Sequence, residues 1–348
     1  VPQFERSKGL DVNAASDNAQ TARKSLSGAS CWVLTDGKAG DVAPCLGLAQ
    51  ALGLAVETRV VKPRLLFAAF SPRGPVDPAE RPDAPGSPIA PPFPEVLIAS
   101  GRRAVPYLRH VRRASGGKTF TIFLKDPRVD PRVADVVWVA EHDRKRGDNV
   151  IATLAAPHLV THEALNAARA NPDPRIAALP EPRMALLLGG ASRHHDFHDK
   201  DVISLVGVVE SMTLTGGSAM ITPSRRTPPH LLAKLRGVCA DAPKHTFLWD
   251  GAGDNPYIQI LAHAATIVVT ADSTNMVGEA IATDAPVMIY EPTGGNARLT
   301  RFIRAVVASG RAKRWRGRLE SWPCRAHDDT QTIADEIARR YALFRVEG

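Results

Sequence analysis

The stretch MALLLGGAS, residues 184–192, joins a continuous apolar run directly to a pair of glycines. An apolar run of this length is typical of a strand that is buried on both faces of a parallel sheet. Paired glycines let the chain bend tightly at the carboxyl end of such a strand and approach a ligand closely. A helix-length segment, 201–215, follows. The stretch therefore predicts the strand–turn–helix unit of a Rossmann-like domain.

The same alternation of short apolar runs and helix-length segments extends in both directions along the chain. The expected strands of a first series are 31–35, 56–61, 95–99, 119–124 and 136–140. Those of a second series are 184–188, 218–222, 246–249, 266–270 and 287–290. Expected helices of the second series are 201–215, 228–240, 257–264, 275–282 and 298–308, and an amphipathic helix over 328–344 ends the chain. This order predicts an α/β protein with two Rossmann-like domains whose parallel sheets face each other across a cleft.

Proline-rich segments indicate where the domains begin and end. Residues 1–29 are polar and predict a flexible N-terminal arm, followed by a first domain over 30–170. Nine prolines in 71–94 exclude regular structure there and predict a surface insertion. Four prolines in 171–182 predict the linker. The second domain is expected over 183–310, and a C-terminal tail with its helix over 311–348.

Composition limits the classes of function. The chain has 348 residues, 44% hydrophobic, with a net charge of +8 and a pI near 9.5, which favours anionic partners. Nucleic acid is not expected as a partner, because no basic run is interleaved with aromatics, which total 5%. The four cysteines form no CxxC pair, which predicts free thiols in a reducing compartment. We expect a cytoplasmic protein that contacts the inner face of a membrane peripherally.

The loop after the first strand, 35–41, is the first candidate site. Asp36, Lys38 and Gly40 lead into Asp41 at the start of a helix. Asp41 could cap that helix, or it could act as a general base toward an acceptor hydroxyl. Two cations after later strands, Arg102 and Lys125, would face the same acceptor. Arg102 and its neighbour Arg103 suit an anionic or lipid-linked acceptor, although these two arginines could also be solvated charges at helix starts.

Two loops of the second domain suit a phosphate group. Gly189, Gly190 and Ser192 offer close main-chain approach and a hydroxyl, and a structural turn is the alternative. Ser224 and Arg225 follow the next strand and could converge on the same pyrophosphate. A solvated arginine pair is the alternative there. Trp249 closes the third strand of this series.

The loop after 266–270 holds Asp272, Ser273, Thr274 and Asn275, which suit either helix initiation or ligand binding. Glu279 lies on the otherwise apolar helix that follows, where an unpaired carboxylate is costly. It could accept two ribose hydroxyls or form a structural salt bridge. We expect no metal site: the Asp199–Asp201 spacing indicates helix capping, and neither GxSxG nor HExxH occurs.

The loops together resemble the mitochondrial fission Elm1-like family. The resemblance is carried by residues 36–40 (DGKAG), 188–192 (LGGAS), 254–257 (DNPY) and 271–279 (ADSTNMVGE). It implies the GT-B glycosyltransferase fold. A more distant similarity is to the N-acetylglucosaminyltransferase that makes lipid II. Asp41 stands where that enzyme family carries a histidine, and Glu279 corresponds to its ribose-binding glutamate.

The resemblance implies a glycosyltransferase that moves a sugar from a nucleotide-sugar donor, its substrate, to an acceptor. That acceptor would be a lipid-linked molecule or a polysaccharide. The implied transfer needs no cofactor and no obligatory metal. Asp41 would act as base or position the acceptor. The alternative is a non-catalytic scaffold acting through protein partners, because plant members of the family are implicated in recruiting a dynamin-related GTPase. A third hypothesis, another nucleotide-sugar enzyme such as an epimerase, is disfavoured by the absence of GxGxxG.

Overall fold

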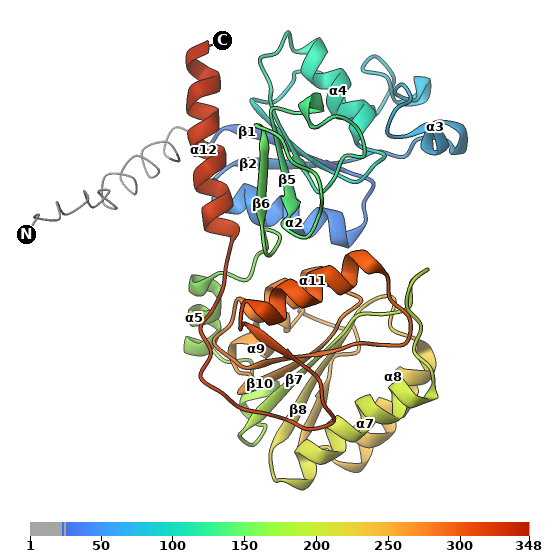
Figure 1. Cartoon of the computed structure of the whole chain (residues 1–348), viewed down its shortest axis with the longest axis vertical. Coiled ribbons are helices and arrows are strands. Elements are labelled where there is room, and N and C mark those ends of the chain that lie inside the picture. Colours follow the sequence, from blue (N-terminus) through green and yellow to red (C-terminus); the bar gives the residue numbers. More distant parts are fainter. Residues whose placement is uncertain (1–22, 24–25, 348) are drawn as a thin grey trace, which may run out of the picture. The chain divides into compact units, whose positions relative to one another are not determined.

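The computed structural model describes residue 23 and residues 26–347, and these divide into two compact units. Unit 1 contains the described residues up to 139, residues 145–151 and the C-terminal segment from 330. Unit 2 contains residues 140–144 and 152–329. Each unit is built around its own six-stranded sheet (Figure 1). Within the described residues, no helix combines the length and apolar character that crossing a bilayer requires.

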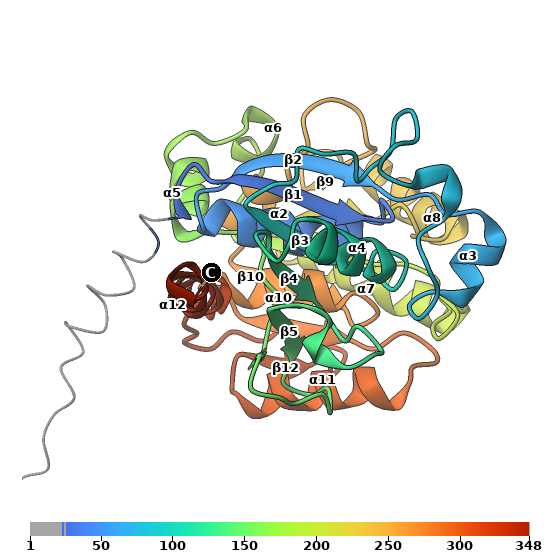
Figure 2. The same ribbon diagram turned by 90° about the horizontal axis from the view of Figure 1, so that it is seen from above.

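The sheet of unit 1 has the strand order β2-β1-β3-β4-β5-β6. Its strands are β1 (Ser30–Thr35), β2 (Ala55–Val60), β3 (Val96–Ser100), β4 (Phe120–Leu124), β5 (Val136–Ala140) and β6 (Val150–Thr153). The pairs from β2 to β5 are parallel, and Figure 2 shows these strands side by side in that order. The predicted strands of the first series are thereby confirmed to within one residue at each end, and β6 is additional.

Among the described residues of unit 1, four labelled α-helices and two 3-10 turns accompany this sheet. They are α2 (Ala39–Ala51), α3 (Leu65–Phe70), α4 (Val105–Ala114) and α12 (Thr330–Glu347), with η1 (Pro78–Glu80) and η2 (Pro131–Val133). Within the proline-rich segment 71–94, η1 is the one regular element among the described residues, as its nine prolines predict. The core joins Leu34, Leu97 and Phe123 of the strands to Tyr107 and Leu108 of α4, all almost fully buried.

Unit 2 has a fully parallel sheet in the order β12-β11-β10-β7-β8-β9. Its strands are β7 (Arg183–Leu188), β8 (Ser218–Pro223), β9 (Thr246–Leu248), β10 (Thr266–Thr270), β11 (Val287–Tyr290) and β12 (Ala312–Arg314). Its helices are α5 (His162–Ala170), α6 (Pro174–Ala177), α7 (Asp199–Leu214), α8 (Pro229–Asp241), α9 (Tyr257–Ala262), α10 (Thr274–Ile281) and α11 (Ala297–Ala308). The predicted elements of the second series are confirmed, and β12 is additional.

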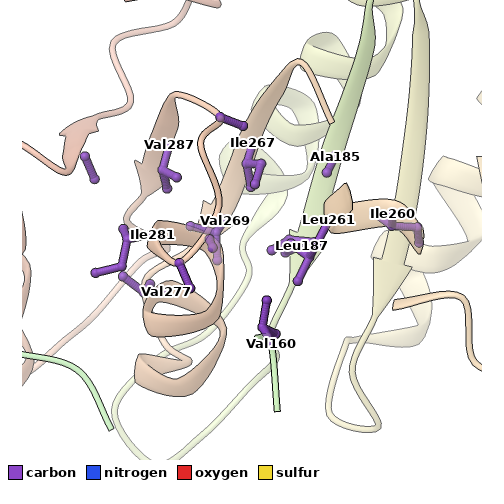
Figure 3. Close-up of a cluster of buried hydrophobic side chains, with 14 of the residues drawn as sticks. Val160, Ala185, Leu187, Ile260, Leu261, Ile267, Val269, Val277, Ile281 and Val287 are labelled. Atoms are coloured by element: carbon purple, nitrogen blue, oxygen red, sulfur yellow. The ribbon is translucent and has the colours of Figure 1, made fainter. Parts of the chain in front are cut away.

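The alternation of side chains along β7 explains why this strand is apolar throughout. Ala185 and Leu187 point to one face of the sheet, where they join Val269 of β10 and Val277 of α10 (Figure 3). The alternate residues of the strand point to the other face, against α7 and α8; they are Met184, Leu186 and Leu188. Helices therefore cover both faces, and the strand-end loops occupy the carboxyl edge of the sheet.

The chain changes units at positions that differ from the predicted linker. It passes from unit 1 to unit 2 within residues 140–152, whereas the sequence predicted the change at 171–182. The reason is α5, which packs against α9 of unit 2: Leu165 and Ala168 share a core cluster with Ile260 and Leu261. The proline-rich segment 171–182 thus lies inside unit 2, where it carries α6.

The predicted C-terminal tail also divides, because residues 311–329 belong to unit 2 and α12 belongs to unit 1. Ile333, Ile337 and Tyr341 of α12 are buried, and the helix packs on α2. Most of the predicted N-terminal arm lies outside the described residues. Leu26, within that arm, is fully buried, so the folded unit begins before residue 30.

Candidate functional site

Three strand ends of unit 1 bring polar side chains together at one edge of the sheet. Ser100 ends β3, Lys125 follows β4, and Asp41 lies in the first turn of α2, which follows β1. Asp41 Oδ1 accepts a hydrogen bond from Lys125 Nζ at 2.7 Å and lies 3.1 Å from Ser100 Oγ. Lys125 Nζ also donates to the carbonyl of Gly40 at 2.6 Å. The structure therefore brings the predicted catalytic residue Asp41 together with two predicted acceptor-side residues, Gly40 and Lys125.

The backbone of Lys125 is strained in a way that a merely solvated charge would not require. Its φ of +78° lies in the left-handed region, which side chains other than glycine rarely adopt. Such conformations persist where the surroundings fix them and gather at functional sites. Here the two hydrogen bonds of the ammonium group fix the residue.

Gly101 lies close to two carboxylates. Gly101 has a φ of +88°, and a Cβ at this position would lie 3.2 Å from Asp41 Oδ2 and 3.8 Å from Asp36 Oδ1. Asp36 is 4% exposed in its side chain, and its Oδ2 pairs with Lys38. Among the described residues its buried Oδ1 has no hydrogen-bond partner. The Asp41 side chain is 15% exposed, so this carboxylate can accept a hydroxyl proton.

Two expectations for this loop change. No side chain caps the start of α2, whose N-cap residue is Lys38, and the Asp41 carboxylate turns toward Lys125 instead. The capping interpretation of Asp41 is therefore wrong. Arg102 does not join the cluster, because it donates to the carbonyl of Ser71 at 3.1 Å. Its neighbour Arg103 lies nearer, with Nη1 at 3.8 Å from Asp36 Oδ2.

In unit 2, the loop after β7 uses its main-chain N–H groups internally. Gly189 N donates to Thr270 Oγ1 at 2.8 Å, and Gly190 N donates to Asp272 Oδ2 at 2.7 Å. Ala191 N donates to the carbonyl of Arg226 at 3.1 Å. Ser192 N donates to the carbonyl of His195 at 2.9 Å. The expectation that these donors face a phosphate is not met, since all four are engaged with the chain itself.

Both glycines are required by close approach to other parts of unit 2. A Cβ on Gly189 would lie 2.2 Å from Asp272 Oδ2, and one on Gly190 would lie 2.0 Å from the carbonyl carbon of Arg226. Atoms at such distances overlap. The paired glycines therefore allow three loops to interlock, which supports the alternative of a structural turn.

Asp272 is the centre of this interlocked region. Its side chain is fully buried, and its Oδ2 lies 3.3 Å from Arg226 Nη2 in addition to accepting from Gly190. Its Oδ1 is buried and has no partner among the described residues. Burial raises the pKa of the Asp272 carboxyl, and the Gly190 N–H opposes the increase. The cap of α10 is Ser273, which accepts from Met276 N, so Asp272 has a role other than capping.

The loop after β8 directs its two adjacent arginines differently. Arg226 Nη1 donates to the carbonyls of Gly190 and Ala191, at 3.2 Å each. Arg225 is exposed and makes no hydrogen bond or ion pair with the described residues. Ser224 Oγ donates to the carbonyl of Gly189 at 2.6 Å, so this hydroxyl closes the loop. Arg225 is the cation of this loop that remains open to an anion.

A glycine pair that the sequence analysis did not single out follows β11. Gly295 N donates to the carbonyl of His194 at 2.6 Å, and Gly294 forms a bridge with His195. A Cβ on Gly294 would lie 2.3 Å from the carbonyl oxygen of His194. Burial lowers the pKa of His195, which favours its neutral form. The signal was available, because residues 293–296 (TGGN) follow a predicted strand as the other loops do.

Glu279 is held by a tyrosine rather than by a salt bridge. Tyr257 Oη donates to Glu279 Oε2 at 2.6 Å, and Tyr257 begins α9. Burial raises the pKa of the Glu279 carboxyl and raises that of Tyr257 well above its usual range. Tyr257 thus fixes one of the two carboxylate oxygens.

The remaining predicted donor residues lie around α9 and α10. Trp249 follows β9, and its Nε1 donates to the carbonyl of Ala252 at 3.3 Å. Thr274 and Asn275 form the first turn of α10. In the part of the chain that the structure describes, no group of three or more His, Cys, Asp or Glu side chains is placed to hold a metal ion.

Comparisons with known proteins identify the family. The model of the family described as mitochondrial fission ELM1 matches residues 39–341. The chain is 25% identical over 275 residues to mitochondrial fission protein ELM1 of Arabidopsis thaliana, which covers 72% of this chain and 64% of that protein. The chain therefore spans less than two thirds of the plant protein. It is also 28% identical over 118 residues to uncharacterized protein RP120 of Rickettsia prowazekii (strain Madrid E), covering 32% of each.

Solved structures show the fold. The glycotransferase of kitacinnamycin superposes with a TM-score of 0.50 at 14% identity, covering 92% of this chain and 95% of that one. MurG of Acinetobacter baumannii gives a TM-score of 0.46 at 13% identity, covering 91% and 94%. With its two parallel-sheet units, the chain has the predicted α/β fold of the GT-B type. Because the family match extends over most of the sequence, the chain belongs to the mitochondrial fission ELM1 family.

Proposed function

We propose that the protein is a glycosyltransferase, in which unit 2 binds a nucleotide-sugar donor and unit 1 activates an acceptor hydroxyl. The observation that carries the proposal is the Asp41 cluster of unit 1. A carboxylate at the carboxyl ends of three strands is oriented through Oδ1 by Lys125 and Ser100. Its Oδ2 lies beside Gly101, and the Asp41 side chain is 15% exposed. The GT-B fold supports the same reaction class.

The Asp41 carboxylate would act as the general base. The acceptor hydroxyl would donate its proton to Asp41 Oδ2 as its oxygen attacks the anomeric carbon of the sugar. The bond from that carbon to the diphosphate oxygen breaks, and the diphosphate leaves with the electron pair. Lys125 holds the carboxylate in place during this step. A partly enclosed carboxylate of this kind fits a small polar or sugar hydroxyl, whether the acceptor is lipid-linked or a polysaccharide.

On the donor side, Glu279 would accept hydrogen bonds from the ribose hydroxyls through Oε1, while Tyr257 fixes Oε2. The charge that develops on the leaving diphosphate requires donors that are free to point at it. Because the amides of residues 189–192 are already engaged, this stabilisation falls to the exposed guanidinium of Arg225. Ser224, Asp272 and the loop glycines would shape the site without touching the phosphates.

Nucleoside diphosphate binding tests the proposal directly. We expect at least one member of a panel of nucleoside diphosphates to bind in titration calorimetry. Glu279→Gln should weaken binding about tenfold, because it loses an acceptor for charge-assisted ribose hydrogen bonds. Glu210→Gln, which removes the same charge from the exposed surface of α7, is the matched control and should bind like wild type. Absence of binding by every nucleotide would refute the donor site.

A non-catalytic scaffold is the second candidate, and a specific observation favours it. The loop that would bind phosphate is closed by its own hydrogen bonds and has the buried Asp272 carboxylate beneath it. The name of the plant relative, a mitochondrial fission protein, is consistent with a role through protein partners. In a strain that lacks the native gene, an Asp41→Asn, Glu279→Gln double variant should restore the phenotype if the protein is a scaffold. It should fail if the protein is a transferase.

We infer a cytoplasmic location from the cysteines. All four cysteines among the described residues are free, and Cys31 and Cys45 are buried. Burial raises the pKa of the Cys31 thiol to about 12, which suppresses the reactive thiolate. Free buried thiols are typical of a reducing compartment. Protease protection of the protein in intact and permeabilised cells would test this location.

A further inference from the structure

The helix α3 presents three large apolar side chains to solvent. Leu65 is 88% exposed, and Leu66 and Phe70 are 63% exposed each. Positions 65, 66, 69 and 70 share one face of a helix, and all four residues are apolar, since residue 69 is alanine. Figures 1 and 2 show α3 at the rim of unit 1, away from α12. This face is the largest group of exposed apolar side chains on one helix among the described residues.

A set of polar contacts fixes α3 in this position. Arg64, which precedes the helix, donates from Nη2 to Asp77 Oδ1 at 2.6 Å, and Asp77 is 1% exposed. After the helix, Arg102 donates to the carbonyl of Ser71 at 3.1 Å. Arg109 of α4 donates to the carbonyl of Gly74 at 2.6 Å. Polar contacts at both ends of α3 therefore fix the helix with its apolar face exposed to solvent.

The sequence segment that contains α3 carries cations only, while Asp77 pairs with Arg64 and Glu80 accepts from Lys62 N at 2.8 Å. The segment KPRLLFAAFSPR, residues 62–73, contains three cations and no acid. Lys62 and Arg73 are exposed at its two ends, and Arg73 N donates to the carbonyl of Phe70, which places it at the end of the helix. Leucine and phenylalanine side chains flanked by lysine and arginine are suited to the surface of an anionic bilayer. Six helical residues are too few to span it.

We propose that α3, with Lys62 and Arg73, docks on an anionic lipid surface, and that Leu65, Leu66 and Phe70 enter the boundary between headgroups and acyl chains. A second copy of the chain fits this face less well. In a twofold contact α3 would meet α3, and the cations at its ends would face each other. The inference does not depend on the transfer reaction, because the proposed catalytic residue Asp41 and the proposed ribose-binding residue Glu279 take no part in it.

Co-sedimentation with vesicles tests the proposal. The wild-type chain should bind vesicles of phosphatidylcholine with phosphatidylglycerol, and it should bind phosphatidylcholine alone at least tenfold more weakly. Leu65→Ser and Phe70→Ser should each weaken binding about tenfold, because each removes a buried apolar side chain. Both side chains are exposed, so folding should be unchanged. Leu214→Ser, at a position 86% exposed on α7, is the matched control and should bind like wild type.

Charge reversal provides a second arm. Arg73→Glu should weaken binding to the anionic vesicles severalfold and leave the weak binding to neutral vesicles unchanged. The proposal is overturned if wild type binds neither vesicle, or if the α3 variants bind as well as Leu214→Ser. It is also overturned if α3 substitutions change only the oligomeric state in analytical ultracentrifugation. Nucleoside diphosphate binding, measured in parallel, should be the same in all α3 variants.

Discussion

Replacing Gly190 by alanine is the sharpest test of the interlocked loops in unit 2. The new Cβ would lie 2.0 Å from the carbonyl carbon of Arg226 and 2.1 Å from its oxygen, where ordinary contacts begin near 3.4 Å. The obstacle is backbone, so one loop must move by more than 1 Å. That movement breaks the 2.7 Å hydrogen bond from Gly190 N to Asp272 and the 3.1 Å bond from Ala191 N to Arg226.

The loss in the free energy of unfolding can be estimated from the two hydrogen bonds that break. A hydrogen bond to a charged group contributes about 1.5–3 kcal/mol, and an ordinary one contributes about 1 kcal/mol. Asp272 is fully buried, so the solvent cannot readily replace its lost donor. We therefore expect Gly190→Ala to lower the free energy of unfolding of unit 2 by about 3 kcal/mol. This value is in the upper range for single substitutions and results from a named clash.

The assay needs a control that adds the same methyl group elsewhere. Gly237 is exposed within α8, and a Cβ there meets no heavy atom within 4 Å. Gly237→Ala should therefore stabilise unit 2 by about 1 kcal/mol, because alanine is the better helix former. Urea unfolding read by hydrogen exchange in β7 and β8 reports unit 2 for both variants. Equal stability of Gly190→Ala and wild type would refute the described packing of residues 189–191 against Arg226.

Three further substitutions test single interactions by urea unfolding. Tyr257→Phe removes the hydroxyl that donates to Glu279 and should cost about 1–2 kcal/mol at neutral pH, less once Glu279 is protonated. Burial raises the pKa of Asp272 in the folded protein above its value in the unfolded chain. Proton binding to Asp272 therefore stabilises the folded state fully below about pH 4, and this stabilisation is lost as the pH rises through the folded pKa. Asp272→Asn should therefore gain on wild type between about pH 4 and pH 7, and a constant difference would contradict this. Arg298→Ala breaks two 2.7 Å bonds to the buried Asp143 and should cost about 1–2 kcal/mol, reduced because Arg298 is half exposed.

The elements that could be predicted from sequence are those whose apolar pattern is complete. The strands β7 and β10 are buried on both faces of the sheet, and a strand of this kind appears in the sequence as an unbroken apolar run. The two missed strands lie at sheet edges. β12 contains Ala312, Lys313 and Arg314, of which only the alanine is buried, so its sequence has no strand signal. Edge strands are determined by the neighbour that they pair with, which a local pattern does not contain.

The change of units within 140–152 escaped prediction for a similar reason. A proline-rich segment is a plausible linker in sequence, but membership of a unit depends on which core a helix packs against. Leu165 and Ala168 of α5 complete the cluster around Leu261, and nothing in the sequence of α5 specifies that partner. Likewise α12 is amphipathic in sequence, yet its apolar stripe identifies no particular sheet.

The location of the candidate site could be predicted from the sequence, whereas the roles of its individual residues could be predicted less well. Parallel strands place their carboxyl ends at one edge, so the loops that hold Asp41 and Gly189 were found from the strand pattern alone. Which groups remain free within a loop depends on side-chain direction. Arg225 and Arg226 are adjacent and chemically alike, and the structure alone shows that the second one joins the Gly190 carbonyl.

The strand-end sites of unit 1 and unit 2 differ in which polar groups remain available to a ligand. This difference decides which experiments can separate an enzyme from a scaffold. In unit 1, the Asp41 carboxylate lies beside Gly101 with its side chain 15% exposed, as a base toward a hydroxyl requires. In unit 2, the amides after β7 are consumed by the chain itself. A transferase must therefore hold its diphosphate through side chains such as Arg225. If Arg225→Ala leaves nucleotide binding intact while Glu279→Gln abolishes it, the site recognises a nucleoside without its phosphates, and the transfer mechanism loses its means of stabilising the leaving group.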